Sequence, residues 1–417
     1  MRTNWAGNLR YSTDRLHLPA SIEEAQDIVR KAEKVRPLGS AHCFNPIADS
    51  TVQQISAEAL DFGIELDADA QVVTVSGGVR YGELAPFLHE HGYAIHNLAS
   101  LPHISIVGAC ATATHGSGVQ NGNLATAVRA IEFIDASGEL VRLSRDADGD
   151  RFAGAVVNLG CLGLVTRISL HIEPTFDMTQ HVYLNQPMAD MVEHADALLA
   201  SGYSVSLFTD YKNQANNQIW VKRKATNTAP VDATFYNGIL ADRNVNPVPR
   251  MSPENCTTQL GVAGPWHERL PHFKMAFTPS SGKELQTEFF VAREHTRAVL
   301  DVYRAMADDL APILMISEIR TAAADDLWMS MAYNRESVIF HCTWEQNWDV
   351  LQALLPRLEA ALKPFDARPH WGKNFRMGRE ELTALYPRFD DFRDLVATYD
   401  PAGKFRNAFM EEKLFGG

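Results

Sequence analysis

Two segments in the first third of the chain are rich in glycine and in small or hydroxylated residues, and they constrain the fold more than any other feature. Residues 38–45 read LGSAHCFN, and residues 99–118 read ASLPHISIVGACATATHGSG. Side chains this small let backbone N–H groups converge on an anion and let the backbone approach a flat ligand closely. We therefore expect the two segments to bind a pyrophosphate-containing cofactor, although a pair of ordinary tight turns would have the same composition.

The common nucleotide-binding and hydrolase motifs are missing from the sequence. No GxGxxG follows the first expected strand, and the nearest approach, Gly116-Ser117-Gly118, lacks the third glycine. There is also no P-loop sequence and no GxSxG nucleophile elbow. A nicotinamide-binding Rossmann domain is therefore disfavoured.

Charge and cysteine content exclude several classes of function. The formal net charge is -13, and an acidic chain is a poor partner for nucleic acid or for an anionic membrane. No run of about 18 apolar residues is present, so we expect no membrane span. The five cysteines are scattered without a CxxC pair, which argues against a disulfide framework and a zinc site. We expect a cytoplasmic protein without a metal ion or a signal peptide.

The pattern of predicted elements changes near Pro174, which together with a length of 417 residues predicts two domains. Before Pro174, strands alternate with helices. In this part we predict helices at 21–34 and 81–91, and strands at 35–38, 71–76, 130–134, 140–143 and 164–172. After Pro174 we predict strands at 204–209 and 218–222, an irregular loop at 244–265, helices near 292–309 and 347–362, and a short helix-and-loop tail.

Two apolar segments of the second half carry polar residues at alternate positions. As a strand, the segment LMISEIRT places Glu318 and Arg320 on one face, and the segment VIFHCTW places His341 and Thr343 on one face. Buried polar groups are costly unless they are paired, so each pair predicts either a satisfied network or a functional site. From the residues alone, a plain Glu318–Arg320 ion pair at a strand end is slightly favoured.

The glycine-rich segments resemble the FAD-binding signature of the vanillyl-alcohol-oxidase (VAO) family of flavoproteins, in particular its alditol (xylitol) oxidase branch. The matching stretches are NWAGN at 4–8, LGSAHCFN at 38–45, residues 97–118, SEIRT at 317–321, HCTW at 341–344, RPHWGK at 368–373 and PAGKF at 401–405. They follow the family's order along nearly the whole chain, so the resemblance is specific. Two departures are Ala41, where relatives often have glycine, and Cys43, where they often have serine.

The resemblance implies an α+β fold of the two-domain VAO/PCMH type, in which a substrate (cap) domain of antiparallel sheet plus helices accompanies the FAD-binding domain. We assign residues 1–175 to the FAD-binding domain, 176–372 to the cap domain, and 373–417 to a C-terminal segment that returns to the FAD domain. It also implies that FAD is bonded covalently to His42, which fixes the flavin and makes it more oxidising. The expected cofactor contacts are Gly39, Ser40, Ala41, His42, Cys43, Ser100, Ser105, Gly108, Thr112, His115, Gly116, Gly118 and Val165.

The same resemblance implies oxidation of a primary hydroxyl of a small polyol, with dioxygen reduced to hydrogen peroxide. His341 is the expected proton acceptor, because an ordinary imidazole pKa of about 6.5 suits the task, and Glu318 is the alternative base. Arg320 and Lys373 would stabilise the developing alkoxide. The residues expected to bind the substrate are Ser100, Glu318, Arg320, Thr343 and Lys373. On composition alone, Lys373 would be a solvated loop lysine and His115 an ordinary loop histidine.

Two other functions stay open at this point. An aldonolactone oxidase or dehydrogenase has the same flavin domain but acts on a sugar-acid lactone. A catalytically silent sugar-binding protein would use the same fold, although the intact set of charged residues argues against it. The sequence does not rank polyols by length, because a single methylene or hydroxyl changes affinity through pocket shape. We expect a monomer that binds a small polyol, dioxygen and FAD, and that binds neither nucleic acid nor membrane.

Overall fold

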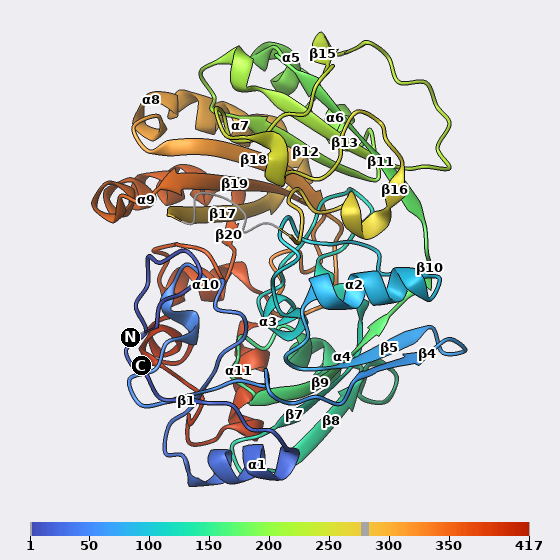
Figure 1. Ribbon diagram of the computed structural model, residues 1–417. Helices are drawn as coiled ribbons and strands as arrows, with labels where there is room; N and C mark the ends of the chain where they lie inside the picture. Colours follow the sequence, from blue (N-terminus) through green and yellow to red (C-terminus); the bar gives the residue numbers. More distant parts are fainter. Residues whose placement is uncertain (1, 277–282, 417) are drawn as a thin grey trace.

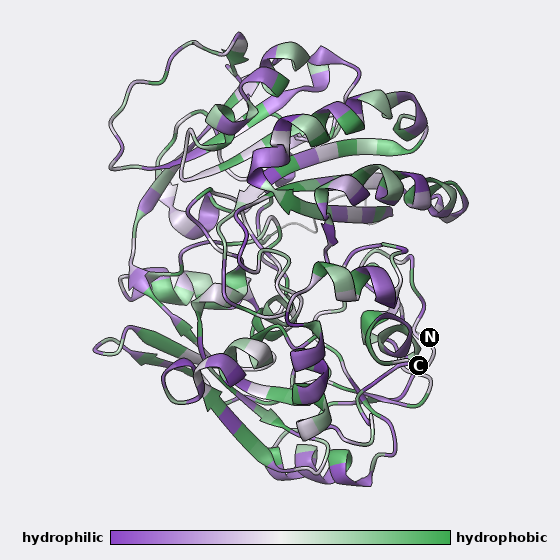
Figure 2. Cartoon of the chain, turned by 180° about the vertical axis from the view of Figure 1, so that it is seen from behind, coloured by the Kyte–Doolittle hydropathy of each residue, from purple (hydrophilic) through white to green (hydrophobic). Residues whose placement is uncertain are grey.

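The computed structural model describes residues 2–276 and 283–416, which form two sheet-containing parts, one above the other in Figure 1. The lower part contains both ends of the chain, which lie side by side in both ribbon views (Figures 1 and 2). The upper part is built on a large antiparallel sheet. The chain passes between the parts at β10 (Glu173–Pro174), where the sequence pattern changes.

The lower part is built on a five-stranded antiparallel sheet in the order β4-β5-β9-β7-β8. Its strands are β4 (Ile64–Asp67), β5 (Val72–Ser76), β7 (Val128–Ile134), β8 (Leu140–Ser144) and β9 (Leu164–His171). The four strands predicted in this region are confirmed to within two residues at each end. Strands β7 and β8 form a hairpin in which Gly138 has φ +82°, a left-handed conformation that favours glycine.

The helices of this part begin and end where local capping dictates. Helix α1 (Ile22–Lys31) begins after Ser21, whose hydroxyl accepts a hydrogen bond from the Glu24 N–H at 3.2 Å. It ends before the predicted residue 34, because Ala32 is already extended. Helix α2 (Tyr81–Glu90) ends before Gly92, which has φ +84°. The strand predicted at 35–38 is only β2 (Arg36–Pro37), which pairs in parallel with β3 (Gln54–Ile55).

The upper part is a ten-stranded antiparallel sheet in the order β14-β15-β11-β13-β12-β18-β19-β17-β20, with β16 beside β11. Its short strands are β14 (Thr234–Phe235), β15 (Gly238–Leu240), β16 (Gly264–Pro265) and β20 (Arg368–Pro369). Its main strands are β11 (Asp177–Leu184), β12 (Ser204–Thr209), β13 (Gln218–Lys224), β17 (Glu284–Ala292), β18 (Leu314–Ala322) and β19 (Ser337–Glu345). Glu288 on β17 lies opposite His341 on β19, which lies opposite Glu318 on β18. Because directly opposed residues have Cβ atoms about 5 Å apart, the strand register alone brings three titratable groups together.

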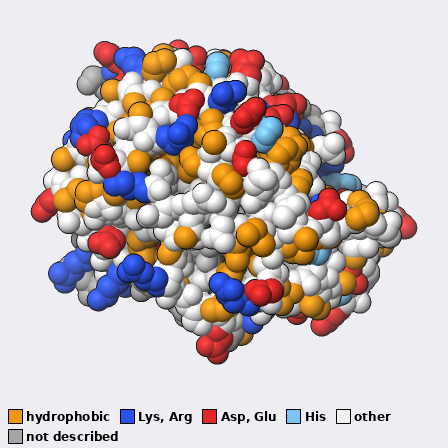
Figure 3. Space-filling model, turned by 90° about the horizontal axis from the view of Figure 1, so that it is seen from above, with side chains coloured by type: hydrophobic (Ala, Val, Ile, Leu, Met, Phe, Trp, Pro, Cys, Tyr) orange, Lys and Arg blue, Asp and Glu red, His pale blue; other side chains and the backbone are white. Residues whose placement is uncertain are grey.

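Helices cover the other face of this sheet. Tyr303 on α7 (Thr296–Ala305) stacks on Phe340 of β19, with ring centroids 5.1 Å apart. Phe340 alternates with His341, so the helices and the titratable row lie on opposite faces. In Figure 2 the strands of both sheets are largely hydrophobic, and hydrophilic residues gather on loops and on the outer sides of helices. The surface over the upper part, in Figure 3, shows hydrophobic side chains among charged ones of both signs.

Several elements of the second half differ from the predictions. The helix predicted at 292–309 is divided into α7 and α8 (Ala307–Leu310). The helix predicted at 347–362 is confirmed as α9 (Trp348–Leu362). The tail is more helical than predicted, with α10 (Arg379–Leu385) and α11 (Phe389–Tyr399). The loop at 244–265 is irregular apart from a short 3₁₀ turn and the two-residue β16 (Gly264–Pro265). Across residues 2–276 and 283–416, no helix is long and apolar enough to cross a membrane.

One buried arginine joins the two ends of the chain. The Arg36 guanidinium is 3% exposed and donates hydrogen bonds to the carbonyl oxygens of Ile47 (2.7 Å), Leu159 (2.5 Å), Gly160 (2.8 Å) and Phe405 (2.7 Å). These carbonyls belong to three segments far apart in sequence. Because the rigid guanidinium fork satisfies all of them at once, Arg36 links the C-terminal segment to the cofactor-side loops.

We expect Arg36→Met to lower the free energy of unfolding by about 3 kcal/mol or more, because it leaves several buried carbonyl groups without a donor. Thermal unfolding followed by circular dichroism measures the effect. Arg36→Lys is the matched control: it keeps the charge but reaches fewer of the carbonyls, so its loss of stability should be smaller. A methionine variant as stable as the parent would contradict the role given to this residue.

Candidate active site

A large cavity lies between the two parts and is lined by residues from both. Its volume is about 270 Å³, which is close to the lower end of the range for ligand pockets. Ten predicted cofactor contacts line it: Gly39, Ser40, Ala41, His42, Cys43, Ser100, Gly108, Thr112, His115 and Val165. The predicted proton acceptor His341 and the predicted substrate-binding residues line the same cavity: Ser100, Glu318, Arg320, Thr343 and Lys373.

The first glycine-rich segment presents His42 to this cavity from a left-handed turn. Ala41 has φ +58°, a conformation that costs an alanine about 1 kcal/mol and that glycine adopts freely. The Trp5 N–H donates to the Ala41 carbonyl at 2.8 Å and holds the turn. The Trp5 ring stacks on the His42 imidazole, with centroids 5.5 Å apart and an interplanar angle of 18°. The turn therefore tolerates alanine at the position where relatives often have glycine.

The two ring nitrogens of His42 are buried, although the residue as a whole is only partly buried. Neither nitrogen forms a hydrogen bond of standard geometry within the described parts of the chain, and the nearby Ser40 backbone raises the His42 pKa by less than burial lowers it. Burial lowers the pKa of His42 to about 4, so its imidazole is neutral at physiological pH. A buried polar group that lacks a partner is unusual, and at a cavity wall it indicates a ligand. This orphaned imidazole is the observation that best supports a flavin at this wall.

The second glycine-rich segment packs directly against the first. The Ser105 N–H donates to the Ser40 hydroxyl at 2.9 Å, and the Ser40 N–H donates to the Ser105 hydroxyl at 3.3 Å. A Cβ on Gly39 would lie 2.7 Å from the Ser105 hydroxyl and 3.5 Å from the Cα of Gly108, so this approach requires glycine. The two segments thus form one continuous wall of backbone and small side chains, as a flat cofactor needs.

Three predicted cofactor contacts do not line the cavity, and their roles are structural. Ser105 is occupied by the bonds to Ser40. A Cβ on Gly116 would lie 2.3 Å from the side-chain oxygen of Asn97. Gly118 has φ +134° and donates its N–H to the Thr321 carbonyl at 3.2 Å, which ties the segment to β18. Glycine is required at both positions by close packing of the protein against itself, which composition alone cannot distinguish from packing against a ligand.

A third wall was predicted only at Val165. Residues 158–160, 163 and 164 also line the cavity, just before β9. Gly163 has φ +149°, and a Cβ there would lie 2.0 Å from the Ile134 carbonyl oxygen. The sequence feature that indicates this wall is the pair of glycines in LGCLG at 159–163, but this segment is short and contains no polar residue.

The opposite wall is the polar face of the ten-stranded sheet, centred on Arg320. The Arg320 guanidinium lies 3.6 Å from a carboxylate oxygen of Glu288 and 3.5 Å from one of Glu318, and it donates to the Ser100 hydroxyl at 3.3 Å. The predicted Glu318–Arg320 ion pair therefore exists. It lies in the middle of a strand and faces the cavity, however, so the interpretation as a strand-end surface pair is wrong.

Lys373 is partly buried in the cavity wall, which corrects the interpretation of a solvated loop lysine. Its ammonium group donates to the Gln286 side-chain carbonyl and lies 4.9 Å from the centroid of the Phe44 ring. Burial lowers the pKa of Lys373 from its ordinary value, whereas nearby Glu288 opposes this shift. The cavity wall thus carries a second cation close to Arg320.

Glu318 is held ionised by a relay that the sequence did not reveal. His272 Nε2 lies 2.7 Å from Glu318 Oε1, and the Lys222 ammonium lies 3.2 Å from His272 Nδ1. Burial lowers the pKa of Lys222 to about 7, and in its protonated form the ammonium only donates, so His272 then carries its proton on Nε2 and donates it to Glu318. Burial opposes ionisation of Glu318, but Arg320 and His272 hold its pKa well below the usual range. No residue within 2–276 or 283–416 binds its Oε2, which remains an acceptor for a ligand.

Glu288 has both carboxylate oxygens engaged. Oε1 lies 2.5 Å from His115 Nε2, and Oε2 lies 2.7 Å from His341 Nδ1. Burial opposes its ionisation, yet the charge of His115 and the hydrogen bonds from both histidines hold its pKa well below the usual value. His115 is therefore more than an ordinary loop histidine, since it lines the cavity and binds a buried carboxylate.

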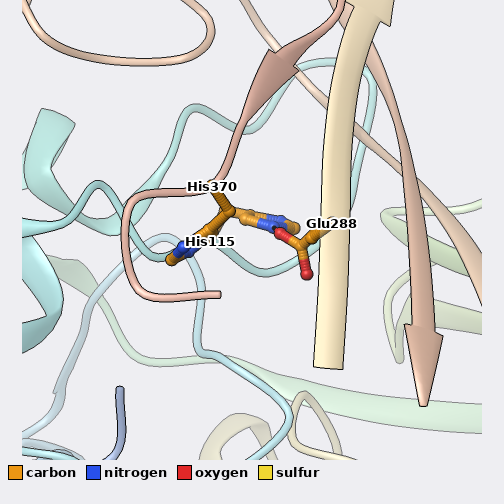
Figure 4. A group of neighbouring side chains, drawn as sticks. All are labelled: His115, Glu288 and His370. Carbon is orange, nitrogen blue, oxygen red and sulfur yellow. Dashed lines mark hydrogen bonds and ion pairs between the residues drawn. The ribbon is translucent and has the colours of Figure 1, made fainter. Parts of the chain in front are cut away.

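His115, Glu288 and His370 together resemble a metal site, with ligand atoms within 4.8 Å of one another (Figure 4). The hydrogen bonds favour a different interpretation. The 2.5 Å contact between His115 and Glu288 leaves no space for an ion between them. His370 Nδ1 accepts the Gly372 N–H at 3.0 Å, so this ring is oriented by the backbone. We therefore treat the cluster as a hydrogen-bond network.

The cavity residues on β17, which the sequence motifs did not single out, follow the same alternation along a strand that identified Glu318 and Arg320 on β18. Glu284, Gln286 and Glu288 alternate along β17 and all line the cavity, as Glu318 and Arg320 do on β18. The signal was therefore available in the segment ELQTEFF. By contrast, His272 lies in an irregular loop, and only the tertiary structure brings it to Glu318.

Comparison with known proteins agrees with this architecture. A FAD binding domain model matches residues 13–144, and a D-arabinono-1,4-lactone oxidase model matches residues 275–413. An alditol oxidase from a Streptomyces species is 45% identical over 99% of each chain. An L-gulono-1,4-lactone dehydrogenase from Mycobacterium tuberculosis is 26% identical over 99% of this chain and 98% of its own. The solved structure of cholesterol oxidase from B. sterolicum has a TM-score of 0.78 over 99% of this chain and 96% of that chain; at 15% identity it supports the fold alone.

The fold and the cavity define a FAD-binding flavoprotein in which a cap sheet faces the cofactor domain. The chain belongs to the vanillyl-alcohol-oxidase family of flavoproteins and, within it, to the alditol oxidase branch. The predicted fold class and the predicted FAD cofactor are confirmed.

Proposed function

We propose that this chain is a FAD-dependent alditol oxidase, which oxidises a primary hydroxyl of a small polyol such as xylitol or sorbitol to the aldose and reduces dioxygen to hydrogen peroxide. The observation that carries the proposal is the position of Arg320 and Lys373 beside His341 on the cavity wall that faces His42. Whole-chain similarity to an alditol oxidase supports the same reaction class. We further propose a monomer in the cytoplasm, where the five thiols, none of which forms a disulfide in the described chain, would remain reduced.

The residues at the cavity wall suit an open-chain substrate with several hydroxyl groups. Glu318 Oε2 would accept a hydrogen bond from one hydroxyl, because the carboxylate is ionised and this oxygen is not engaged by the protein. The hydroxyls of Thr343 and Ser100 both donate and accept, so they would bind neighbouring hydroxyls of the same chain. A polyol therefore satisfies buried polar groups that would otherwise be costly.

The first chemical requirement is removal of the hydroxyl proton. Nδ1 of His341 faces the Glu288 carboxylate, so its Nε2 is the acceptor on the cavity side, where it lies 3.2 Å from the Thr343 hydroxyl. Burial lowers the pKa of His341, and Glu288 opposes this shift, so the ring is a neutral base. Glu318 is the weaker candidate, because its pKa is held well below the usual range.

The second requirement is stabilisation of the negative charge that develops on the substrate oxygen. Arg320 and Lys373 are cationic donors in a buried site, where a charge interaction is much stronger than in water. When bound, FAD supplies the two-electron chemistry as a hydride acceptor that dioxygen reoxidises. The chain itself would hold the carbinol carbon at near-attack distance through its polar contacts with the substrate.

FAD would be held by the two glycine-rich segments, with a covalent bond to His42. The neutral, buried imidazole has a free nitrogen that is competent as a nucleophile. The neighbouring Cys43 is a poor alternative nucleophile, because burial raises the pKa of its thiol to about 11.

A substrate panel tests the function directly. Xylitol and sorbitol should reduce the flavin and release hydrogen peroxide, whereas gulonolactone should do so far more slowly. Peroxide release and anaerobic bleaching of the flavin are the two measurements. Faster turnover of gulonolactone would favour an aldonolactone oxidase, and lactone oxidation with an artificial acceptor but little peroxide would favour a dehydrogenase. A purified protein that carries no flavin would refute the proposal.

Arg320→Ala should lower turnover with xylitol by about 100-fold or more, because it removes a donor to the developing alkoxide. The flavin should remain bound, since Arg320 lies on the cap wall rather than among the glycine-rich segments. Steady-state kinetics and the flavin absorption spectrum measure the two effects. Arg320→Lys keeps the charge without the fork and should be intermediate. Wild-type turnover in the alanine variant would contradict the assignment.

His42→Ala should convert covalent FAD into dissociable FAD. After acid precipitation, the wild-type pellet should be yellow and its supernatant colourless, whereas the variant should show the reverse. Cys43→Ser is the matched control at the adjacent position and should keep a yellow pellet. If the serine variant, rather than the alanine variant, releases the flavin, the attachment is at Cys43 and the assignment of His42 is wrong.

A further inference from the structure

The most completely engaged titratable group in the cavity wall is the Glu288 carboxylate, which is 1% exposed. We propose that Glu288, supported by His115, is a positioning residue that holds His341 in the tautomer whose Nε2 accepts the substrate proton. This inference rests on the proposed function and deepens it. Glu288 does not reach the substrate, because each of its oxygens is bound by a histidine of the protein.

The tautomer follows from the hydrogen bonds. A neutral imidazole carries one proton, and an ionised carboxylate only accepts. His341 Nδ1 lies 2.7 Å from Glu288 Oε2, so the proton is on Nδ1. The lone pair of Nε2 then points toward the Thr343 hydroxyl at 3.2 Å and toward the cavity. Without the carboxylate, nothing at this position would favour this tautomer over the one that cannot act as a base.

His115 supplies the charge that keeps Glu288 ionised. Its Nδ1 lies 2.7 Å from the Gly116 carbonyl oxygen, and its Nε2 lies 2.5 Å from Glu288 Oε1. Both partners are acceptors when the carboxylate is ionised, so both nitrogens of His115 carry protons and the ring is an imidazolium. Two cations, His115 and Arg320 at 3.6 Å, therefore flank the Glu288 carboxylate. A buried carboxylate with this support is an anchor for the base.

Proton transfer then balances without moving a proton to Glu288. The substrate O–H bond breaks, an N–H bond forms at His341 Nε2, and the resulting imidazolium remains hydrogen-bonded to the carboxylate through Nδ1. The charged and titratable groups around His341 are Glu288 on β17, Glu318 and Arg320 on β18, Lys373 and His370 beside β20 (Arg368–Pro369), and His115 on the other side of Glu288. The two carboxylates favour the imidazolium, while Lys373, Arg320 and the charge on His115 oppose it. Removal of the Glu288 charge should therefore make His341 a weaker base.

The main experiment is Glu288→Gln in the flavin-loaded enzyme. We expect the rate of anaerobic flavin reduction by xylitol to fall by about 100-fold or more. We also expect the acid limb of its pH profile to move to lower pH by about one unit or more, because an opposite charge in direct contact shifts a pKa by that amount. Glu288→Asp keeps the charge and should restore part of the rate and of the profile. A merely structural role would lower the rate without moving the acid limb.

The matched control is Glu359→Gln. Glu359 is also a buried carboxyl, but it lies on α9, accepts a hydrogen bond from the Arg376 N–H and does not line the cavity. Burial raises its pKa to about 7, so at neutral pH replacement by an amide removes only about half of a negative charge, at a site away from the cavity. This variant should have the wild-type rate and pH profile. An unchanged rate and profile in Glu288→Gln would overturn the proposal.

A second measurement does not depend on turnover. In protein labelled with ¹⁵N-histidine, we expect His341 to carry its proton on Nδ1 and His115 to be protonated on both nitrogens, with His341→Asn and His115→Asn used for assignment. An Nε2-protonated His341 would overturn the inference, even if Glu288→Gln does not fold. If polyols fail to reduce the flavin but the Nδ1 tautomer is found, the proposed substrate is wrong and the positioning by Glu288 stands.

Discussion

The cavity depends on Arg320 and the two carboxylates beside it. An arginine and two glutamates, all less than 10% exposed, would be destabilising on the face of a sheet unless each charge were paired. Strand register solves this problem, because Glu288, His341 and Glu318 lie in one row across three neighbouring strands. Helices pack on the opposite, apolar face, so the charged face is left for the cavity. The same pairing that makes these charges tolerable also fixes their geometry.

The carboxylates of Glu288 and Glu318 lie in the same environment, but they differ in whether one oxygen remains available to a ligand. Both contact Arg320, and each accepts a hydrogen bond from a histidine. Glu288 has no oxygen left for a ligand, whereas Glu318 keeps Oε2. Hydrogen bonding therefore separates two carboxylates of the same residue type: Glu288 is fully engaged by the protein, and Glu318 keeps one oxygen for a ligand. Lys222, whose pKa burial lowers to about 7, lies behind His272 and contacts the second pair through it.

How much of the site the sequence could predict depends on the range of the interactions. Alternation along a strand is local, so it correctly placed Glu318 with Arg320 and His341 with Thr343 on the cavity face. The same pattern would have found Glu288. Burial of Lys373 is not local, since it depends on Phe44 and Gln286, which are far away in the chain. For the same reason composition could not show that Gly116 and Gly118 pack against the protein rather than against the cofactor.

By itself the sequence determined the fold class, the faces of the central strands and the small-residue segments that line the cavity, because each of these depends on side-chain size or on a period of two along a strand. Its family motifs also determined that FAD is the cofactor. Only the tertiary structure decided which charges are paired. Register between β17, β19 and β18, together with the loop that carries His272, sets the distances that determine ionisation and tautomer. Electrostatic energy depends on distance and burial, and neither can be read from residues that meet only after folding.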